Sequence, residues 1–383
     1  MGRRVLITGA RAAAALDCAR DFASAGWEVH LADSVDVRMA RWSALDARHH
    51  RYPSPRQRSA DFRAWVRELV ETYDFDLIVP TCEEVFHLAS PSLRQALASR
   101  LFAPDIALLT KLHDKLTFAR LARECGLDTP ECHAIEGALD RDRFARDSHD
   151  WVFKPRMSRF GEHTLVSPPS QAAREVPTQG WMAQNYVRGD EVCLHAIAHK
   201  GALVACSSYS SEWRMRGGAS FAFMPTDPAR DEHLRDIAAT LVQKANLHGQ
   251  FGFDIIFDED DAPQLLECNP RATSGVHLLV GEGELVRAIA SGEEIMQGQR
   301  RSAYLAPAMI VFGLPQAIRG GRLREWWDAM KAGRDAISRR GDRMPLLGAL
   351  ADAGAFALIG LRRGISTNAA TTYDIEWNGE ALS

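Results

Sequence analysis

Two consecutive apolar segments carry polar side chains that a buried strand does not normally hold. FGFDIIF (251–257) has Asp254 at its centre, and QLLECN (264–269) has Glu267 and Asn269 two residues apart. The polar run between the segments, DEDDAP, predicts a turn. The sequence therefore predicts an antiparallel hairpin with acidic and amide groups on its strands.

The spacing of these polar residues predicts a cation site. In a hairpin symmetric about residues 260–261, Asp254 lies opposite Glu267, and Asn269 points to the same face. Two buried carboxylates this close repel each other unless a positive charge compensates them. Mg²⁺ binds carboxylate and amide oxygens and leaves positions for phosphates, so we expect a metal here. The alternative, a solvated face with unrelated acids, fits poorly with the apolar neighbours.

The sequence FDIIFDEDDAPQLLECNPR resembles the metal-binding hairpin of the ATP-grasp superfamily. This superfamily includes D-alanine–D-alanine ligase, biotin carboxylase and carbamoyl phosphate synthetase. The resemblance implies that Asp254, Glu267 and Asn269 hold two Mg²⁺ ions, with Mn²⁺ as an alternative, on the phosphates of ATP. It also implies a catalytic role for Arg271, which would stabilise a transferring phosphoryl group or an acyl phosphate.

Further motifs of the superfamily occur in the expected order. The resemblance assigns Lys115 in HDKLTF and Lys154 in VFKP to the phosphates of ATP. An amine inside an apolar strand such as WVFKP needs an anion nearby, whereas Lys115 taken alone would be an ordinary helix lysine. In AQNYVRGDEV the resemblance assigns the adenine and ribose contacts to Gln184, Asn185, Tyr186, Val187 and Glu191.

The loop that covers the phosphates departs from the superfamily pattern. It usually contains several glycines, but PRMSRFGEHTLV has only Gly161. We expect Arg156 or Arg159 to supply positive charge to the nucleotide instead. A second glycine cluster, RMRGGASFAF, offers Arg216 as a catalytic contact to the γ-phosphate or the acceptor, although a plain surface turn explains the same residues equally well.

Alternating strands and helices at the N-terminus predict a parallel sheet. RRVLITG, WEVHLAD and DLIVPT have the pattern of buried strands, and DFRAWVRELVETY that of a helix between them. The basic run RHHRYPSPRQR (48–58) is interpreted as a surface loop. The loop TGARAAAA has one glycine where a dinucleotide fingerprint needs three, which argues against a Rossmann oxidoreductase.

Several residues are candidates for substrate binding. Glu83 and Glu84 follow a strand end, where α/β sheets usually bind ligands. Either residue could bind a substrate amine, or both could be first-turn helix carboxylates favoured by the dipole. Ser274, in the turn after the hairpin, is a third substrate candidate. The residues available to bind carboxylates are Arg159, Arg214, Arg216 and Arg271.

Composition excludes several classes of protein. The chain of 383 residues has a formal net charge of -4, so we expect neither nucleic acid nor a membrane as a partner. The seven cysteines form no CxxC pair, which is typical of reduced thiols in the cytoplasm. No run reaches about 18 uninterrupted apolar residues, so we expect a soluble protein.

We predict an α/β and α+β fold with ATP between two antiparallel sheets. The expected regions are a Rossmann-like pre-ATP-grasp domain (1–110), an ATP-grasp domain (111–300) with a small subdomain at about 130–187, and a C-terminal appendage (301–383). The segment STNAATTYDIEWNG near the C-terminus is interpreted as a lid on the ATP domain. Several superfamily members are homodimers, and the resemblance suggests the same here.

The resemblance implies an ATP-dependent ligase. It would activate a small, amino-acid-like carboxylic acid as an acyl phosphate and join it to an amine, with release of ADP and phosphate. Alternatives within the superfamily are a carboxylase-like enzyme that uses bicarbonate and a kinase-like enzyme. A protein that binds ATP without turnover is a further alternative, but the complete set of lysines and metal ligands argues against it.

Overall fold

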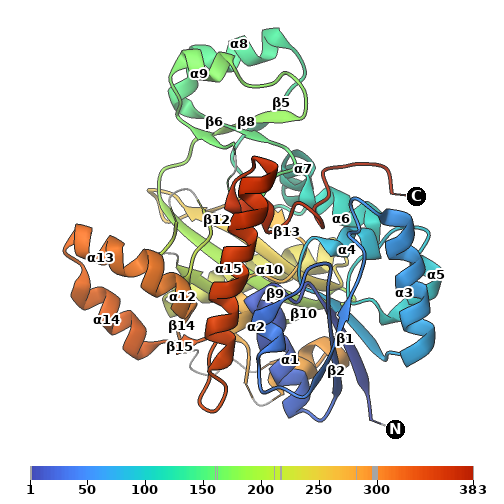
Figure 1. Cartoon of the computed structure of the whole chain (residues 1–383). Helices are drawn as coiled ribbons and strands as arrows, with labels where there is room; N and C mark the ends of the chain where they lie inside the picture. Colours follow the sequence, from blue (N-terminus) through green and yellow to red (C-terminus); the bar gives the residue numbers. More distant parts are fainter. Residues whose placement is uncertain are drawn as a thin grey trace.

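The computed structural model describes residues 2–382 except 160, 162, 211, 216–217, 282 and 296–300. The predicted catalytic residue Arg216 therefore lies outside the described residues. Three β-sheets organise the described part of the chain (Figure 1).

The N-terminal sheet is parallel throughout, with strand order β3-β2-β1-β4. Its apolar strands are buried against α1, where Val5 and Ile7 pack with Leu16 and Phe22 in one core. This confirms the predicted parallel arrangement, since helices connect strands that run in the same direction. The strands are β1 (Arg4–Thr8), β2 (Glu28–Asp33), β3 (Ala47–Arg51) and β4 (Leu77–Pro80). The helices are α1 (Ala13–Ser24), α2 (Arg38–Arg41), α3 (Ser59–Tyr73), α4 (Glu84–Leu88), α5 (Arg94–Leu97), a 3₁₀ turn (Ala98–Arg100) and α6 (Ile106–His113).

The prediction of a surface loop over the basic run 48–58 is wrong for its first part. Arg48 to Arg51 belong to β3, the edge strand that pairs in parallel with β2. The ring of His50 stacks on that of His30, with the two centroids 5.0 Å apart. Burial lowers the pKa of His50 to about 4. The polar composition concealed this strand because its imidazole packs as a neutral ring.

The central sheet has seven strands in the order β13-β12-β9-β10-β11-β14-β15, antiparallel except for the last pair. Helix α10 begins at Pro228, directly after Asp227, which caps the helix by accepting a hydrogen bond from the Arg230 N–H at 3.0 Å. Leu234 and Leu241 of α10 pack in one core with Phe253 of the sheet. The strands are β9 (Asp190–His199), β10 (Ala202–Ser210), β11 (Ala222–Pro225), β12 (Gly249–Phe257), β13 (Pro263–Asn269), β14 (Ala303–Tyr304) and β15 (Arg334–Asp335), and the helices are α7 (Lys115–Glu124) and α10 (Pro228–Lys244).

The small sheet is antiparallel, with the order β5-β8-β6-β7. It lies above the central sheet in Figure 1, with α8 and α9 on its outer side. Phe144 and Phe153 are buried in its core. The two antiparallel sheets confirm the predicted fold class. The elements are β5 (Cys132–Ile135), α8 (Ala138–Arg146), a 3₁₀ turn (Ser148–Asp150), β6 (Trp151–Pro155), β7 (Leu165–Val166), α9 (Ser170–Arg174) and β8 (Trp181–Asn185).

Apart from β14 and β15, the elements after β13 are short helices and one long helix, α15, which crosses the front of the molecule in Figure 1. Among the described residues, α15 alone is long and apolar enough to cross a membrane, and 22% of its apolar window is buried. Asp352 interrupts its apolar run and hides the helix from a search for uninterrupted apolar residues. The elements are the 3₁₀ turn Ser274–Leu278, α11 (Glu284–Val286), π-helical Arg287–Ser291, α12 (Ala306–Ala308), π-helical Met309–Gly313, α13 (Leu314–Gly320), α14 (Leu323–Ala332), α15 (Met344–Arg363) and α16 (Thr367–Ala370).

The segment interpreted as a lid on the ATP domain lies mainly against the N-terminal sheet. Asp374 pairs with Arg11 at 2.7 Å, and Arg11 also pairs with Asp33 at the end of β2 at 2.5 Å. The backbone carbonyl of Thr371 accepts a further hydrogen bond from Arg11 at 2.7 Å. The C-terminal segment is therefore fixed at the carboxyl ends of the parallel strands, where the sequence carries a buried arginine between two carboxylates.

Candidate functional site

The hairpin of β12 and β13 brings the two predicted acidic ligands together. Asp254 pairs with Glu267, which confirms the predicted register at the polar positions. The assumption of a symmetric turn is wrong, because Ile255 pairs with Leu265 and the register shifts by one residue between Asp254 and Ile255. The extra residue is a β-bulge, a feature that re-aims side chains next to functional sites.

Asn269 lies beside the two carboxylates, as predicted. Its side-chain amide donates a hydrogen bond to Asp254 Oδ2 at 3.3 Å. Gly252 stands opposite Asn269, and a Cβ added there would lie 2.1 Å from the methyl carbon of Thr273. Glycine at this position therefore permits the turn after the NPR sequence to fold back over the strand.

Two lysines, one from helix α7 and one from the small sheet, meet on Glu267. Lys115 Nζ lies 3.3 Å and Lys154 Nζ 3.9 Å from Glu267 Oε2. Lys115 begins α7, and Asp114 caps that helix by accepting a hydrogen bond from the Leu116 N–H at 3.0 Å. Lys154 is in β6 of the small sheet. Glu267 thus connects the central sheet to α7 through the ammonium group of Lys115 and to the small sheet through that of Lys154.

Electrostatics distinguish the two carboxylates. Burial and the neighbouring charge of Glu267 raise the pKa of Asp254. Burial acts to raise the pKa of Glu267 as well, but the ammonium groups of Lys115 and Lys154 outweigh it and hold that pKa below its usual range. The lysines therefore compensate Glu267, while the charged form of Asp254 lacks such compensation and would be stabilised by a bound cation.

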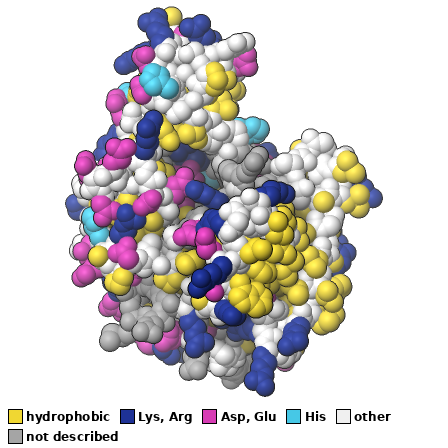
Figure 2. All heavy atoms as spheres, turned by 90° about the vertical axis from the view of Figure 1, so that its left-hand side faces the viewer, with side chains coloured by type: hydrophobic (Ala, Val, Ile, Leu, Met, Phe, Trp, Pro, Cys, Tyr) yellow, Lys and Arg dark blue, Asp and Glu magenta, His cyan; other side chains and the backbone are white. Residues whose placement is uncertain are grey.

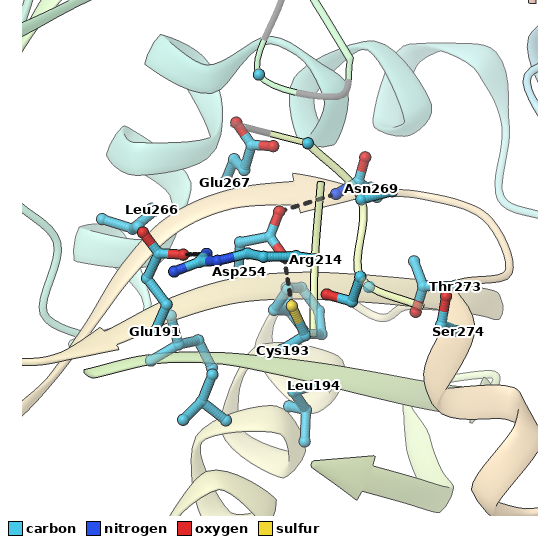
Figure 3. Close-up of a pocket in the computed structure, with 18 of the residues that line it drawn as sticks. Glu191, Cys193, Leu194, Arg214, Asp254, Leu266, Glu267, Asn269, Thr273 and Ser274 are labelled. Atoms are coloured by element: carbon cyan, nitrogen blue, oxygen red, sulfur yellow. Dashed lines mark hydrogen bonds and ion pairs between the residues drawn. The ribbon is translucent and has the colours of Figure 1, made fainter. Parts of the chain in front are cut away.

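A cavity of about 440 Å³ opens beside these groups. Figure 3 shows Asp254 between Asn269 and Cys193, with Glu191 and Arg214 close together on another side of the cavity. Its polar lining includes Lys154, Glu191, Asp254, Glu267, Asn269 and Arg271.

The predicted adenine and ribose residues divide into two groups. Glu191 lines the cavity and forms an ion pair with Arg214. Gln184 is buried on β8 beside the hairpin, where its amide donates to the Leu266 carbonyl at 3.4 Å. The nucleotide-binding roles of Glu191 and Gln184 stay predictions. The residues of this group that lie outside the cavity lining are Gln184, Asn185, Tyr186 and Val187.

Glu83 is buried between two predicted functional arginines. Its carboxylate oxygens lie 3.0 Å from Arg271 Nε and 3.0 Å from Arg159 Nε. Burial alone would raise the pKa of Glu83, but Arg159 and Arg271 hold it well below the usual range. Arg271 lines the cavity, whereas Arg159 lies outside the lining and donates to the Trp377 carbonyl at 2.6 Å. The structure therefore places Arg159 beside the C-terminal segment.

The two other substrate candidates lie in different places. Glu84 is fully buried in the N-terminal domain and accepts a hydrogen bond from the Thr8 hydroxyl at 2.7 Å. The backbone N–H of Thr81 donates to the same oxygen at 3.2 Å. Glu84 therefore has the surroundings expected of a carboxylate in the first turn of a helix, which was the alternative to substrate binding. Ser274 lines the cavity.

Two cavity residues were missed from the sequence. Cys193 lies beside Asp254 in the β9–β12 register, and its thiol donates to Asp254 Oδ1 at 3.2 Å. Tyr209 pairs with Cys193 on β10. Burial and the Asp254 charge raise the pKa of the Cys193 thiol. The pairing of β9 with β12, which a long helix separates in the sequence, was the missing signal.

The oxygen atoms that the hairpin side chains offer suit a hard cation that also binds a ligand. Within the described ranges, no group of three or more His, Cys, Asp or Glu side chains could hold a metal ion by itself. Asp254 and Glu267 supply two carboxylates, and Asn269 supplies an amide oxygen. These oxygens fit Mg²⁺, which usually completes its shell with water and substrate phosphates.

Comparison with protein families identifies the class of the chain. Residues 112–275 match the family model of the ATP-grasp domain. This range includes both lysines and the complete hairpin. Residues 112–275 are therefore an ATP-grasp domain.

Several solved structures of other proteins have a similar fold. The N5-carboxyaminoimidazole synthetase of Staphylococcus aureus complexed with ADP is 13% identical, with a TM-score of 0.63 over 82% of this chain and 85% of that one. The biotin carboxylase domain of Hydrogenobacter thermophilus 2-oxoglutarate carboxylase, a dimer with MgADP and bicarbonate, is 13% identical, with a TM-score of 0.62 over 79% and 73%. The L-amino acid ligase of Bacillus licheniformis is 15% identical, with a TM-score of 0.58 over 79% and 78%. No curated protein matches the chain by sequence.

Proposed function

We propose that this protein is an ADP-forming ligase that activates a small carboxylic acid with ATP and joins it to an amine. The observation that carries the proposal is the meeting of Lys115 and Lys154 on Glu267, beside the half-buried Asp254, at a cavity that Lys154, Asp254 and Glu267 line. Charges of both signs converge there from two sheets, which a purely structural ion pair does not require. The similar fold of structures that contain ADP supports the same reading.

The lysines and the hairpin would act on the phosphates of ATP. Lys115 and Lys154 bind phosphate oxygens, and Asp254, Glu267 and Asn269 hold Mg²⁺. When bound by these residues, Mg²⁺ would supply positive charge that neutralises the phosphates. Burial lowers the pKa of Lys154, although the nearby Glu267 opposes this effect, so a phosphate group also restores the charge balance of a buried amine.

The acid would be activated next to Arg271. An oxygen of the substrate carboxylate attacks the γ-phosphorus, which forms an acyl phosphate and releases ADP. The amine nitrogen then attacks the acyl carbon, loses a proton and expels phosphate. Arg271 is held by Glu83 at 3.0 Å and is therefore oriented before the substrate binds. Its guanidinium stabilises the negative charge of the acyl phosphate and of the tetrahedral intermediate.

Bicarbonate is a second candidate for the acid. The similar structures include a biotin carboxylase domain with bound bicarbonate and N5-carboxyaminoimidazole synthetases. Bicarbonate activation would use the same lysines, hairpin and arginine, and an amine would accept the carboxyl group. The two candidates differ in the acid alone.

The test is Mg²⁺-dependent ADP release with pools of carboxylic acids, bicarbonate and amines, with wild type beside Glu267→Gln. ADP release that needs both an acid and an amine, and that is lost in the variant, supports the ligase. Release that needs bicarbonate in place of the acid pool supports the second candidate. Formation of AMP and pyrophosphate contradicts the acyl-phosphate route, and ADP release with an alcohol alone indicates a kinase.

A further inference from the structure

One side of the molecule exposes a broad apolar face. Figure 2 shows hydrophobic side chains that gather there, with Lys and Arg side chains around them. Helix α15 contributes Leu347, Leu350, Leu358 and Leu361, whose exposed fractions are 53%, 45%, 46% and 80%. Their spacing of three, eight and three residues places all four on one side of the helix. Isolated exposed leucines are common, but a contiguous group of this size marks an interaction surface.

The opposite side of α15 is fixed to the N-terminal domain. The Asp352 carboxylate accepts hydrogen bonds from the backbone N–H groups of Arg38 and Met39 at 3.0 and 2.8 Å. Gly348 packs so closely on α2 that an added Cβ would lie 2.7 Å from the Arg38 carbonyl. α15 is therefore held lengthwise along the surface of the protein, with its leucines outward.

Neighbouring elements extend the same face. Helix α12 packs against α15, and the π-helical segment that directly follows α12 exposes Ile310, Val311 and Phe312 by 49%, 51% and 44%. On α14, Trp327 is 53% exposed. Exposed tryptophan and aliphatic side chains are typical of surfaces that bind at a membrane–water interface.

The charge of this region differs from that of the whole chain. Residues 301–365 contain eleven Lys or Arg and five Asp or Glu, whereas the complete chain has a net charge of -4. Exposed arginines lie at both ends of α15, with Arg340 and Arg343 at its start and Arg362 and Arg363 at its end. An apolar helix face bordered by basic residues is the pattern of a helix that lies in the plane of an anionic membrane surface.

We propose that this face, formed by α15, the segment Met309–Gly313 and α14, binds the surface of an anionic lipid bilayer. The leucines enter the headgroup boundary, and the arginines bind lipid phosphates. A second copy of the chain is the less suitable occupant, because a two-fold interface on this face would bring the same arginines of both copies together. The proposal does not depend on the proposed ligase function.

The test is co-sedimentation of the full chain with vesicles of phosphatidylcholine alone and of an equimolar mixture with phosphatidylglycerol. We expect binding to the anionic vesicles at low salt, with weaker binding at high salt. Leu358→Glu with Leu361→Glu should abolish it. Arg362→Gln with Arg363→Gln should weaken it about tenfold or more.

Matched controls use surfaces far from this face in the sequence. Leu139→Glu changes a leucine that is 88% exposed on α8, and Arg58→Gln with Arg94→Gln removes two exposed arginines of the N-terminal domain. Both should bind vesicles as wild type does. Circular dichroism and thermal melting verify that every variant is folded.

Three results would overturn the proposal. The first is that the wild-type chain stays in solution with anionic vesicles at low salt. The second is equal binding to neutral and anionic vesicles without an effect of the arginine variants. The third is a dimer in analytical ultracentrifugation that the leucine variants dissociate, in a chain that binds no vesicles, which would assign the face to a second copy.

Discussion

Two clusters of buried charge in this protein have opposite character. The first, called the hairpin cluster, contains Asp254, Glu267, Lys115 and Lys154. The second surrounds Asp17 of α1, which contacts His277 Nδ1 at 2.8 Å, Arg334 at 2.8 Å and Arg339 at 2.7 Å. These partners come from the 3₁₀ turn after β13 and from the region around β15. The Asp17 cluster therefore joins the N-terminal domain to segments late in the chain.

The difference lies in how each carboxylate is compensated. Burial would raise the pKa of Asp17, but His277 and Arg334 outweigh it and hold that pKa well below its usual range. The pKa of Asp254 is raised instead, and Asp254 lines a cavity whereas Asp17 does not. Excess positive charge around a buried acid stabilises the fold, whereas an excess negative charge beside a cavity is suited to a cation and its ligand.

Among the experiments that test this comparison, the largest expected effect is a loss of ATP turnover. Asp254→Asn removes one of two adjacent carboxylates, so we expect Mg²⁺-dependent ATP turnover to fall by about 100-fold or more. The melting temperature of the ligand-free protein should stay the same or rise, because the repulsion with Glu267 is relieved. Steady-state kinetics and calorimetry measure the two quantities. A variant that melts much earlier would show that Asp254 is structural.

Asp17→Asn should have the opposite profile. It leaves the nearby arginines without their buried partner, and we expect a loss of about 3 kcal/mol in the free energy of unfolding. Turnover of the folded fraction should stay near the wild-type value, because Asp17 lies outside the cavity lining. Urea denaturation and kinetics below the melting range test this. Full stability of the variant would remove the distinction between the clusters.

A third experiment compares the two lysines of the hairpin cluster. Lys115→Met and Lys154→Met each remove one charge that would bind a phosphate, so we expect KM for ATP to rise about tenfold or more in each. Lys111→Met removes an exposed lysine of α6 and serves as the matched control. Unchanged KM in both variants would mean that the lysines serve to compensate Glu267 and do not contact ATP.

The smallest expected effect is a pH dependence of the Asp17 cluster. The folded-state pKa of Asp17 is lowered, so its contribution to stability is present above the unfolded value of about 4 and decreases as the pH falls through the folded value. The difference in unfolding free energy between wild type and Asp17→Asn should therefore be largest near neutral pH and smaller in acid. A difference that grows as the pH falls would contradict the assignment.

Local sequence patterns alone predict the hairpin, its acidic pair and the alternation of strands and helices in the N-terminal sheet. These features depend on local periodicity and turn chemistry, so residues such as Asp254 and Glu267 could be paired by counting. The same local signals predicted Lys154 inside an apolar strand. The bulge next to Asp254 was not predictable by counting, because an inserted residue leaves the apolar pattern almost unchanged.

Contacts between distant segments depend on how the sheets and helices pack. The folded structure placed Lys115 and Lys154 on Glu267, Cys193 beside Asp254, and Glu83 between Arg159 and Arg271. It also showed that the apolar side of α15 is exposed. A buried helix could have the same composition, so composition alone did not predict this exposure. Periodicity along the chain reports which side of an element is apolar, but strand order, sheet packing and long-range charge compensation determine what that side faces.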